Sequence, residues 1–164
     1  MSDVVCRRAT KEDVDYIMAL LNEPDNWRYL ADDNSPMPTR DNVATAIDAP
    51  QMYLLIPESD GYPMGLFFLM PQNSITYDLH SVIQKEFRGE PAITACRAMG
   101  AFMFGQTPCQ KIVTSSPANN VRAKYLAHKC GMVLEGVNRM SYLKDGALQD
   151  QYVFGVCKGE AQCQ

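Results

Sequence analysis

A chain of 164 residues, of which 46% are hydrophobic and 21% charged, has the size and composition of one globular domain, not of a disordered, fibrous or coiled-coil protein. The formal net charge of −4 gives no general attraction to nucleic acid, so no direct nucleic-acid partner is expected. The same charge slightly favours cationic partners such as amines, although an acidic balance is also common among ordinary globular proteins.

No run of about 20 apolar residues occurs, and the opening MSDVVCRRATKEDVD is charged, so we expect neither a membrane span nor a signal sequence, and a cytoplasmic location. The six cysteines are scattered, with no Cys-x-x-Cys pair and no Cys/His cluster at metal-ligand spacing. This pattern predicts free thiols and no metal site, and it argues against a thiol-redox or zinc protein.

The N-terminal part of the chain predicts a strand followed by two helices. Residues 4–8 are β-type, and Thr10 with the acidic residues after it is typical of a helix N-cap. The first helix is predicted to end at Asn22, because apolar residues recur up to there at helical spacing. A second helix is predicted over 40–47, capped by Thr39.

The segment 24–38 between these helices is rich in Asp, Asn and Pro and is expected to be irregular. It holds the one tryptophan of the chain, Trp27, close to Tyr29. These side chains either anchor the segment on the core or contact a substrate, and the sequence leaves both readings open.

The rest of the chain predicts an antiparallel meander and then a crossover. Three β-rich runs at 52–57, 64–70 and 74–83 are separated by turn residues. The later elements are expected in the order helix 91–105, strand 111–115, helix 119–130 and a hairpin of strands 132–142 and 148–157.

This order of elements is a mixed α/β (α+β) pattern, and it resembles that of the GNAT acyl-coenzyme A N-acyltransferases over nearly the whole chain. The resemblance implies a mostly antiparallel sheet of six to seven strands, splayed between the fourth and fifth strands, with about four helices. The length of the chain predicts a single domain, which we place over residues 1–157, and the polar residues 158–164 are expected to form a flexible tail.

The segment IQKEFRGEPA, from Ile83 to Ala92, resembles the family's coenzyme A site, where amides at a helix N-terminus hold a diphosphate. Only part of the pattern Arg/Gln-x-x-Gly-x-Gly/Ala is kept, because Pro91 and Ile93 stand where small residues are expected, and proline has no N–H to donate. An ordinary helix that starts with proline is the alternative reading. The resemblance implies these cofactor-binding residues: Val82, Ile83, Arg88, Gly89, Glu90, Pro91, Ala92, Ile93 and Asn120.

Two further segments carry the resemblance. NVRAKYLAHKCGM, which starts at Asn120, is similar to the family's Asn-x-x-Ala/Ser helix, so Asn120 either contacts the coenzyme arm or only caps the helix. LKDGALQDQYVF, which starts at Leu143, resembles the closing hairpin of the ribosomal-protein N-terminal acetyltransferase branch. The degenerate segment from Ile83 to Met132 also resembles phage-encoded members of the family.

The family resemblance and the strand pattern also indicate candidate catalytic groups. The resemblance implies that an amide near Val82 and Ile83 stabilises the oxyanion. Asp78 and His80 alternate along a strand and so share one face, which makes His80 the candidate base, unless that face is simply polar.

The family's usual acid, a tyrosine seven residues after the motif asparagine, is replaced by Ala127. Tyr125 would point to another face of the helix, and His128 lies nearer to that position. Water or the substrate amine could also relay the proton to the thiolate.

The sequence therefore predicts an acetyl-coenzyme A-dependent N-acetyltransferase that acts on a protein N-terminus, a lysine or a small amine. It leaves a homodimer open as the oligomeric state. The alternative hypothesis is a GNAT-fold protein that has kept the scaffold and lost the reaction, and serves in binding or assembly.

Overall fold

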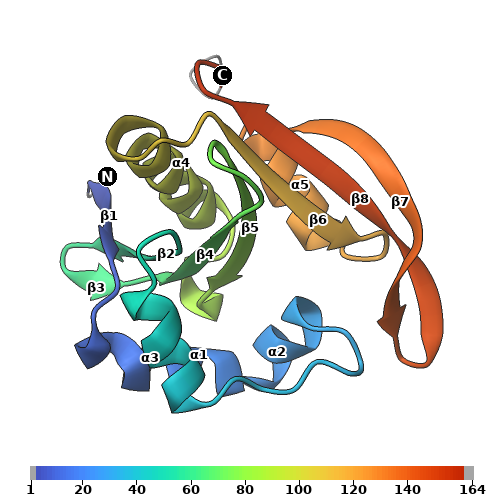
Figure 1. Ribbon diagram of the computed structural model, residues 1–164, viewed down its shortest axis with the longest axis horizontal. Helices are drawn as coiled ribbons and strands as arrows, with labels where there is room; N and C mark the ends of the chain where they lie inside the picture. The colour runs from blue at the N-terminus through green and yellow to red at the C-terminus, as the bar shows by residue number, and fades with distance from the viewer. Residues whose placement is uncertain (1–2, 161–164) are drawn as a thin grey trace.

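A sheet of eight strands lies at the centre of the computed structural model, which describes residues 3–160 (Figure 1). The strand order is β1-β2-β4-β5-β6-β8-β7, with the two-residue strand β3 beside β2, and β5–β6 is the parallel pair in an otherwise antiparallel sheet. This confirms the predicted mixed α/β class. The strands are β1 Val4–Arg8, β2 Tyr53–Ser59, β3 Tyr62–Pro63, β4 Gly65–Pro71, β5 Thr76–Ile83, β6 Lys111–Pro117, β7 Val133–Lys144 and β8 Ala147–Cys157.

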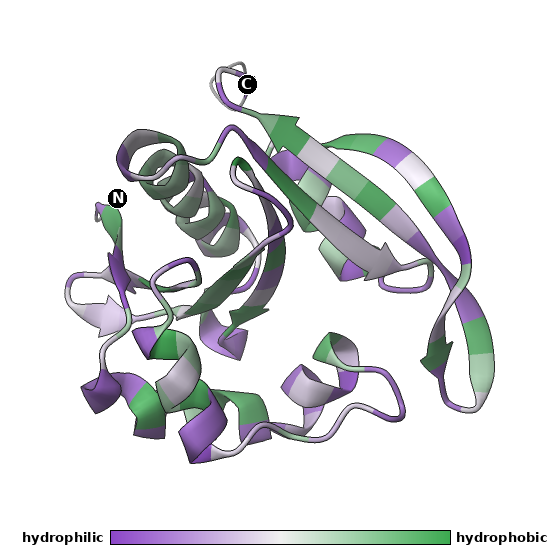
Figure 2. Cartoon of the chain, in the orientation of Figure 1, coloured by the Kyte–Doolittle hydropathy of each residue, from purple (hydrophilic) through white to green (hydrophobic). Residues whose placement is uncertain are grey.

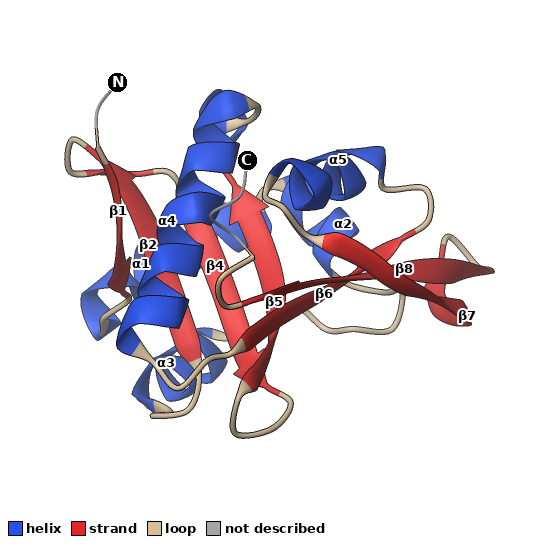
Figure 3. Cartoon of the chain, turned by 90° about the horizontal axis from the view of Figure 1, so that it is seen from above, coloured by secondary structure: helices blue, strands red, loops and turns tan. Residues whose placement is uncertain are grey.

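Helices cover both faces of the sheet (Figure 3). In the described part of the chain they are α1 Val14–Asn22, α2 Pro24–Leu30, α3 Arg40–Asp48, α4 Glu90–Gln106 and α5 Val121–Lys129, with 3-10 turns at Lys11–Asp13 and Lys85–Phe87. None of the helices within residues 3–160 combines the length and apolar character that a bilayer crossing requires.

The alternation of side chains along the strands produces two separate cores. On one face, Phe67 and Leu69 of β4 pack with Met99 and Met103 of α4. On the other face, the core is formed by α1, α3 and the opposite sides of the same strands, and it includes Ile17, Val43, Ile56 and Leu66. Apolar residues accordingly dominate β4 and α4 (Figure 2). The central strands are therefore buried on both faces, and polar side chains on them need a reason.

Strands β5 and β6 pair only at their beginning. Their register runs from Thr76 opposite Lys111 to Asp78 opposite Val113, and beyond this point the strands run apart (Figure 1). At the apex, the Thr114 hydroxyl donates to the carbonyl of Leu79 at 2.8 Å. We call this opening the fork; it is the predicted splay of the sheet.

Helix α2 corrects the expectation that residues 24–38 are irregular. Pro24 ends α1 but also stands in the first turn of α2, where the missing N–H costs nothing and the fixed φ suits a helix. The helix is anchored by Asn26, which is buried and donates from Nδ2 to the carbonyl of Leu20 at 2.8 Å. Pro24 thus ends α1, as the sequence predicts, and it also begins α2, which the sequence analysis does not predict.

The structure also differs slightly from the predicted elements at a turn and near the C-terminus. β3 falls partly within a segment that was predicted to be only a turn. Residues 158–160, assigned to a flexible tail, form a turn after β8 that is tied down by the Lys158 amide donating to the carbonyl of Gln110 at 2.8 Å. The rest of that tail, with Cys163, lies outside the described residues, and the division into one domain and a tail stays a prediction.

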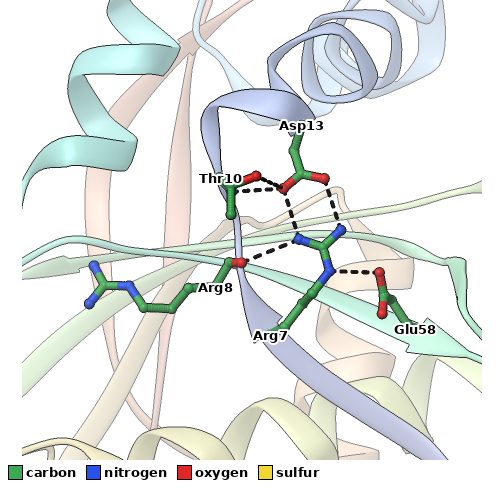
Figure 4. Close-up of polar contacts among 5 residues, drawn as sticks. All are labelled: Arg7, Arg8, Thr10, Asp13 and Glu58. Carbon is green, nitrogen blue, oxygen red and sulfur yellow. Dashed lines mark hydrogen bonds and ion pairs between the residues drawn. The ribbon is translucent and has the colours of Figure 1, made fainter.

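An arginine connects β1 with the start of the first helix (Figure 4). Arg7 places Nη1 and Nη2 each 2.8 Å from the two carboxylate oxygens of Asp13, and its Nε 2.7 Å from Oε1 of Glu58. The Asp13 carboxylate also accepts from the Thr10 amide at 2.7 Å, which closes the capping box. The Arg7 guanidinium lowers the pKa of Asp13 below its ordinary value, because it binds the charged form.

Asp13→Asn should lower the free energy of unfolding by about 1 kcal/mol at pH 7, a modest value because Arg7 is partly exposed to solvent. A depressed native pKa stabilises the fold above the unfolded pKa of about 3.9 and loses this effect as the pH falls through the native pKa. In urea titrations, the difference in the free energy of unfolding between wild type and variant should therefore become smaller below about pH 4. Asp48→Asn is the control, because Asp48 and its partner Lys11 are both exposed; an equal loss there would contradict the assignment.

Candidate functional site

A cavity of about 870 Å³ passes through the fork. On one face of the sheet its wall is made by α4 and α5, which contribute small residues such as Gly100 and Ala123. On the other face it is lined by Leu30 of α2, Tyr142 of β7 and Gln151 of β8. A ligand can therefore reach the ends of β5 and β6 from both sides of the sheet.

His80 and Asp78 lie on β5 on the face covered by α1–α3, as predicted from their alternation. Both line the cavity, and Nε2 of His80 is 3.3 Å from Oδ2 of Asp78. The imidazole is partly exposed, with 35% of its side-chain surface accessible, and its ring leans on Phe68 with 6.3 Å between ring centroids. A carboxylate in this position orients the ring and stabilises the charged imidazolium that a base becomes. The role of His80 as base stays a prediction.

The backbone of β5 presents its amides alternately to β4 and to the fork. The Gln84 amide donates to Met64 of the β4 side at 3.0 Å, whereas the Leu79 carbonyl accepts from Thr114 across the fork. Because both polar groups of a strand residue point the same way, the amides of Ser81 and Ile83 face the open fork and that of Val82 faces β4. Ile83 thus has the orientation that an oxyanion donor needs, and so does Ser81, which the sequence analysis did not name, whereas the Val82 amide points to β4. The roles of these residues stay predictions.

The N-terminus of α4 begins with Gly89 at φ 89° as N-cap, a conformation that favours glycine. The Ile93 amide already donates to the Gly89 carbonyl at 3.3 Å, and the side chains of Ala92 and Ile93 are buried in the core. This leaves the amides of Gly89, Glu90 and Ala92 without an intrahelical acceptor, while Pro91 has no N–H. Residues 88–93 are not part of the cavity wall, and neither are Val82 and Ile83.

Arg88 does not point to this helix start. Its Nη2 lies 3.3 Å from Oδ1 of Asn26, so the guanidinium connects the loop before α4 to α2. The cations on the cavity wall are instead Arg97 of α4 and Lys158 after β8. Sequence reasoning missed both, although helical spacing places Arg97 on the same face of α4 as Ala101 and Phe104.

Asn120 caps α5 and also lies on the cavity wall, and its contact with the coenzyme arm stays a prediction. Its side-chain oxygen accepts from the Ala123 amide at 3.1 Å, so it caps α5, and the residue also lines the cavity. The cap uses only the oxygen, which leaves Nδ2 as a donor toward a ligand.

Ala127, at the position of the family's tyrosine, is buried on the cavity wall. Tyr125 and His128 are exposed and do not belong to the wall, and the Tyr125 ring instead meets Nζ of Lys129 at 5.6 Å. Two phenols line the cavity: Tyr29 of α2, which is exposed, and Tyr142 of β7, whose pKa is raised mainly by burial.

A second cavity of about 340 Å³ adjoins the first on the α1–α3 face. Its wall is mostly apolar and includes Leu21, Ala46, Leu66 and Phe68. His80 belongs to the walls of both cavities. The candidate base therefore lies where an open, partly polar space meets an apolar one.

In the described residues 3–160, no three His, Cys, Asp or Glu side chains gather in a way that could hold a metal ion. The groups at the fork are the β5 amides without a strand partner and the imidazole of His80 beside the carboxylate of Asp78. The cavity reaches the fork from both faces of the sheet. These groups suit the attack of an amine on an acyl carbonyl, with the amides receiving the oxyanion and the imidazole the proton. The site is thus of the acyl-transfer class.

The family model for the acetyltransferase (GNAT) domain matches residues 3–133. The chain belongs to this family, which confirms the predicted enzyme class, N-acetyltransferase, and the predicted co-substrate, acetyl-coenzyme A. No match was found among curated protein sequences.

Among solved structures, the chain is similar to spermidine N-acetyltransferase from Vibrio cholerae in complex with CoA and spermine, at 20% identity and a TM-score of 0.84 over 98% of this chain and 99% of that one. A chimera of that enzyme with hSSAT gives 20% identity and a TM-score of 0.84 over 99% and 100% of the two chains. At this identity the likeness shows the fold. The ribosomal-protein branch, a phage origin, a homodimer and the cytoplasmic location stay predictions.

His80→Asn should lower kcat about 100-fold while the KM for acetyl-coenzyme A changes little, because general-base catalysis typically contributes 10²–10⁴-fold. The low-pH limb of the pH–rate profile should disappear with the imidazole, which steady-state kinetics across pH 5–9 will show. His128→Asn is the matched control, since the second histidine is exposed on α5 away from the cavity. Equal activity of the two variants would remove His80 from the mechanism.

Proposed function

We propose that this enzyme transfers an acetyl group from acetyl-coenzyme A to the primary amine of a small acceptor whose remaining part is apolar. The observation that carries the proposal is the position of His80, which forms a shared wall of the reaction cavity and the apolar cavity. An amine deprotonated at His80 has an apolar space within reach on the same side of the sheet.

The acetyl donor is assigned to the α4–α5 side of the fork. There the amides of Gly89, Glu90 and Ala92 are suited to the diphosphate, and Arg97 and Lys158 offer positive charge along the cavity. Asn120 can donate from Nδ2 to the pantetheine arm. The acetyl carbonyl then lies at the amides of Ser81 and Ile83.

The acceptor is assigned to the opposite side. Asp78, paired with His80 at 3.3 Å, is the one carboxylate on the described walls of the two cavities. It suits a single cationic amine that binds and loses one proton before attack. Leu21, Leu66 and Phe68 of the second cavity offer the apolar surface, where each buried CH₂ group contributes about 0.8 kcal/mol.

Other acceptors fit this wall less well. A polyamine such as the spermine bound by the structural relative carries several charges, and each needs an anionic partner or water. A lysine side chain or a protein N-terminus would bring polar backbone to a mostly apolar wall. Of these, an N-terminus followed by an apolar side chain comes nearest to the proposed acceptor.

A panel of acceptors tests the proposal. With acetyl-coenzyme A and thiol release as readout, 2-phenylethylamine should be acetylated with a kcat/KM at least tenfold above that of spermidine and of a lysine-containing peptide, because a buried ring gains roughly 2 kcal/mol. A preference for spermidine would replace the proposed acceptor class. Turnover of none of these acceptors, with acetyl-coenzyme A bound in calorimetry, would point to the binding-protein hypothesis.

Filling the apolar cavity gives a second test. Ala46→Leu on α3 should raise the KM for 2-phenylethylamine about tenfold by occupying the space meant for its ring, and should leave the KM for acetyl-coenzyme A unchanged. Thr45→Leu, an exposed neighbour on the same helix, is the matched control and should behave like wild type. An unchanged amine KM in a folded Ala46→Leu protein would place the acceptor elsewhere.

A further inference from the structure

The loop after α2 is fastened to the tip of the β7–β8 hairpin (Figure 1), although the two segments are 112 residues apart in the sequence. The carboxylate of Asp33 accepts from the Asp145 amide at 3.0 Å and from the Gly146 amide at 2.8 Å. In addition, the Asp33 amide donates to the carbonyl of Leu143 at 3.1 Å. One residue of the loop thus makes three hydrogen bonds to the hairpin.

Lys144 of β7 adds a second connection. Its Nζ donates to the carbonyl of Ala31 at 3.0 Å and lies 4.0 Å from Oδ1 of Asp33. Both charged side chains are partly shielded from solvent, with 16% of the Lys144 and 29% of the Asp33 side chain exposed, so salt screens this pair less than a pair on the open surface. The contact between Arg28 and Asp145 is longer, 3.5 Å, and exposed on both sides, so it contributes little.

The turn at the tip of the hairpin presents two amides to Asp33. Asp145 and Gly146 have positive φ values, 50° and 74°, as in a two-residue turn of type I′, where the amides of the central residues take no part in pairing the strands. The Gly146 amide, more than any other group, lowers the pKa of Asp33 below its ordinary value. The carboxylate is therefore charged at neutral pH and can bind both amides at once.

β7 is irregular between this tip and the rest of the hairpin. The register shifts between Asn138 and Tyr142, where three residues of β7, 139–141, stand opposite one residue of β8. Met140 has a φ of 52° there, a left-handed conformation that is uncommon for a side chain of this size. Since the pairing that stiffens a hairpin is interrupted, the tip depends on contacts of its own to keep its position.

The fastened segments form part of the cavity wall on the face assigned to the acceptor. Leu30 and Tyr142 both line the cavity. Each is followed in the chain by a residue that bonds to the other segment, Ala31 to Lys144 and Leu143 to Asp33. These bonds therefore fix the spacing between two parts of the wall that come from distant parts of the chain.

We propose that Asp33 is a positioning residue for the acceptor: by fastening the hairpin tip to the loop after α2, it holds Leu30 and Tyr142 at the spacing that the bound amine needs. The part about the acceptor rests on the proposed function, whereas the fastening does not. Asp33 itself is not on the cavity wall, so it acts through these neighbours and does not touch the substrate.

Hydrogen–deuterium exchange on the full chain tests the fastening. In Asp33→Ala, the amides of residues 143–146 should exchange about tenfold faster than in wild type, because Asp145 and Gly146 lose their acceptor. Residues 151–157 of β8 pair with β6 and should exchange as in wild type. Unchanged exchange at the tip of Asp33→Ala would overturn the proposal.

Asp32→Ala is the matched control for this variant. The Asp32 carboxylate accepts from the Asn34 amide and from the Ser35 hydroxyl, each at 2.9 Å, and both groups belong to its own loop. The exchange of the hairpin tip in Asp32→Ala should therefore equal that of wild type. Equal acceleration of the tip by Asp32→Ala and Asp33→Ala would show that the loop as a whole, and not Asp33, holds the hairpin.

Steady-state kinetics test the positioning, with the amine that the wild type acetylates best as acceptor. Asp33→Ala should raise the KM for this amine about tenfold and change kcat and the KM for acetyl-coenzyme A less than about twofold. A general loss of folded protein would lower the apparent kcat and leave both KM values unchanged. Asp33→Asn keeps one oxygen that can accept from the turn, and its amine KM should fall between those of wild type and Asp33→Ala.

The two experiments separate failure of this proposal from failure of the proposed function. An unchanged amine KM in Asp33→Ala, or an equal rise in the KM of both substrates, would overturn the positioning role. If the wild type binds acetyl-coenzyme A and acetylates no amine, the proposed function fails and the positioning role falls with it. The exchange experiment would still decide whether Asp33 fastens the hairpin tip.

Discussion

The structure depends on the parting of β5 and β6 after three paired residues. A sheet normally satisfies its backbone groups by pairing, and unpaired groups buried away from water are costly. Here Ser81 and Ile83 have no partner on β6, and Ser81 lies on the cavity wall instead. The Thr114 hydroxyl on the Leu79 carbonyl satisfies the last group at the apex. The fork is therefore where we propose that the oxyanion is held.

The spaces on the two faces of the sheet differ in their lining around this fork. α4 and α5 enclose a space with small side chains and two cations, whereas α1–α3 enclose an apolar one. His80 belongs to both spaces because side chains alternate along β5 and because the strand has lost its neighbour there. A tight contact keeps β5 in place, since a Cβ atom on Gly65 would lie 2.2 Å from the Val82 carbonyl oxygen.

Charged residues near the site serve packing as well as chemistry. Arg88, which follows the family pattern by its place in the chain, binds Asn26 of α2, and Asn26 in turn holds the end of α1. This chain joins the loop before α4 to the helices on the opposite face. The positive charge along the cavity comes instead from Arg97 and Lys158.

The sequence by itself determined the class of fold and most elements, because helical spacing, caps such as Thr39 and turns such as Asp145-Gly146 are local signals. It also placed Asp78 and His80 on the same face of the sheet, because successive side chains of a strand point to opposite faces. Only the tertiary structure decided that Pro24 begins a helix and that the Ile83 amide faces the fork while that of Val82 does not. These facts follow from register and from the packing of distant elements, which no local pattern encodes.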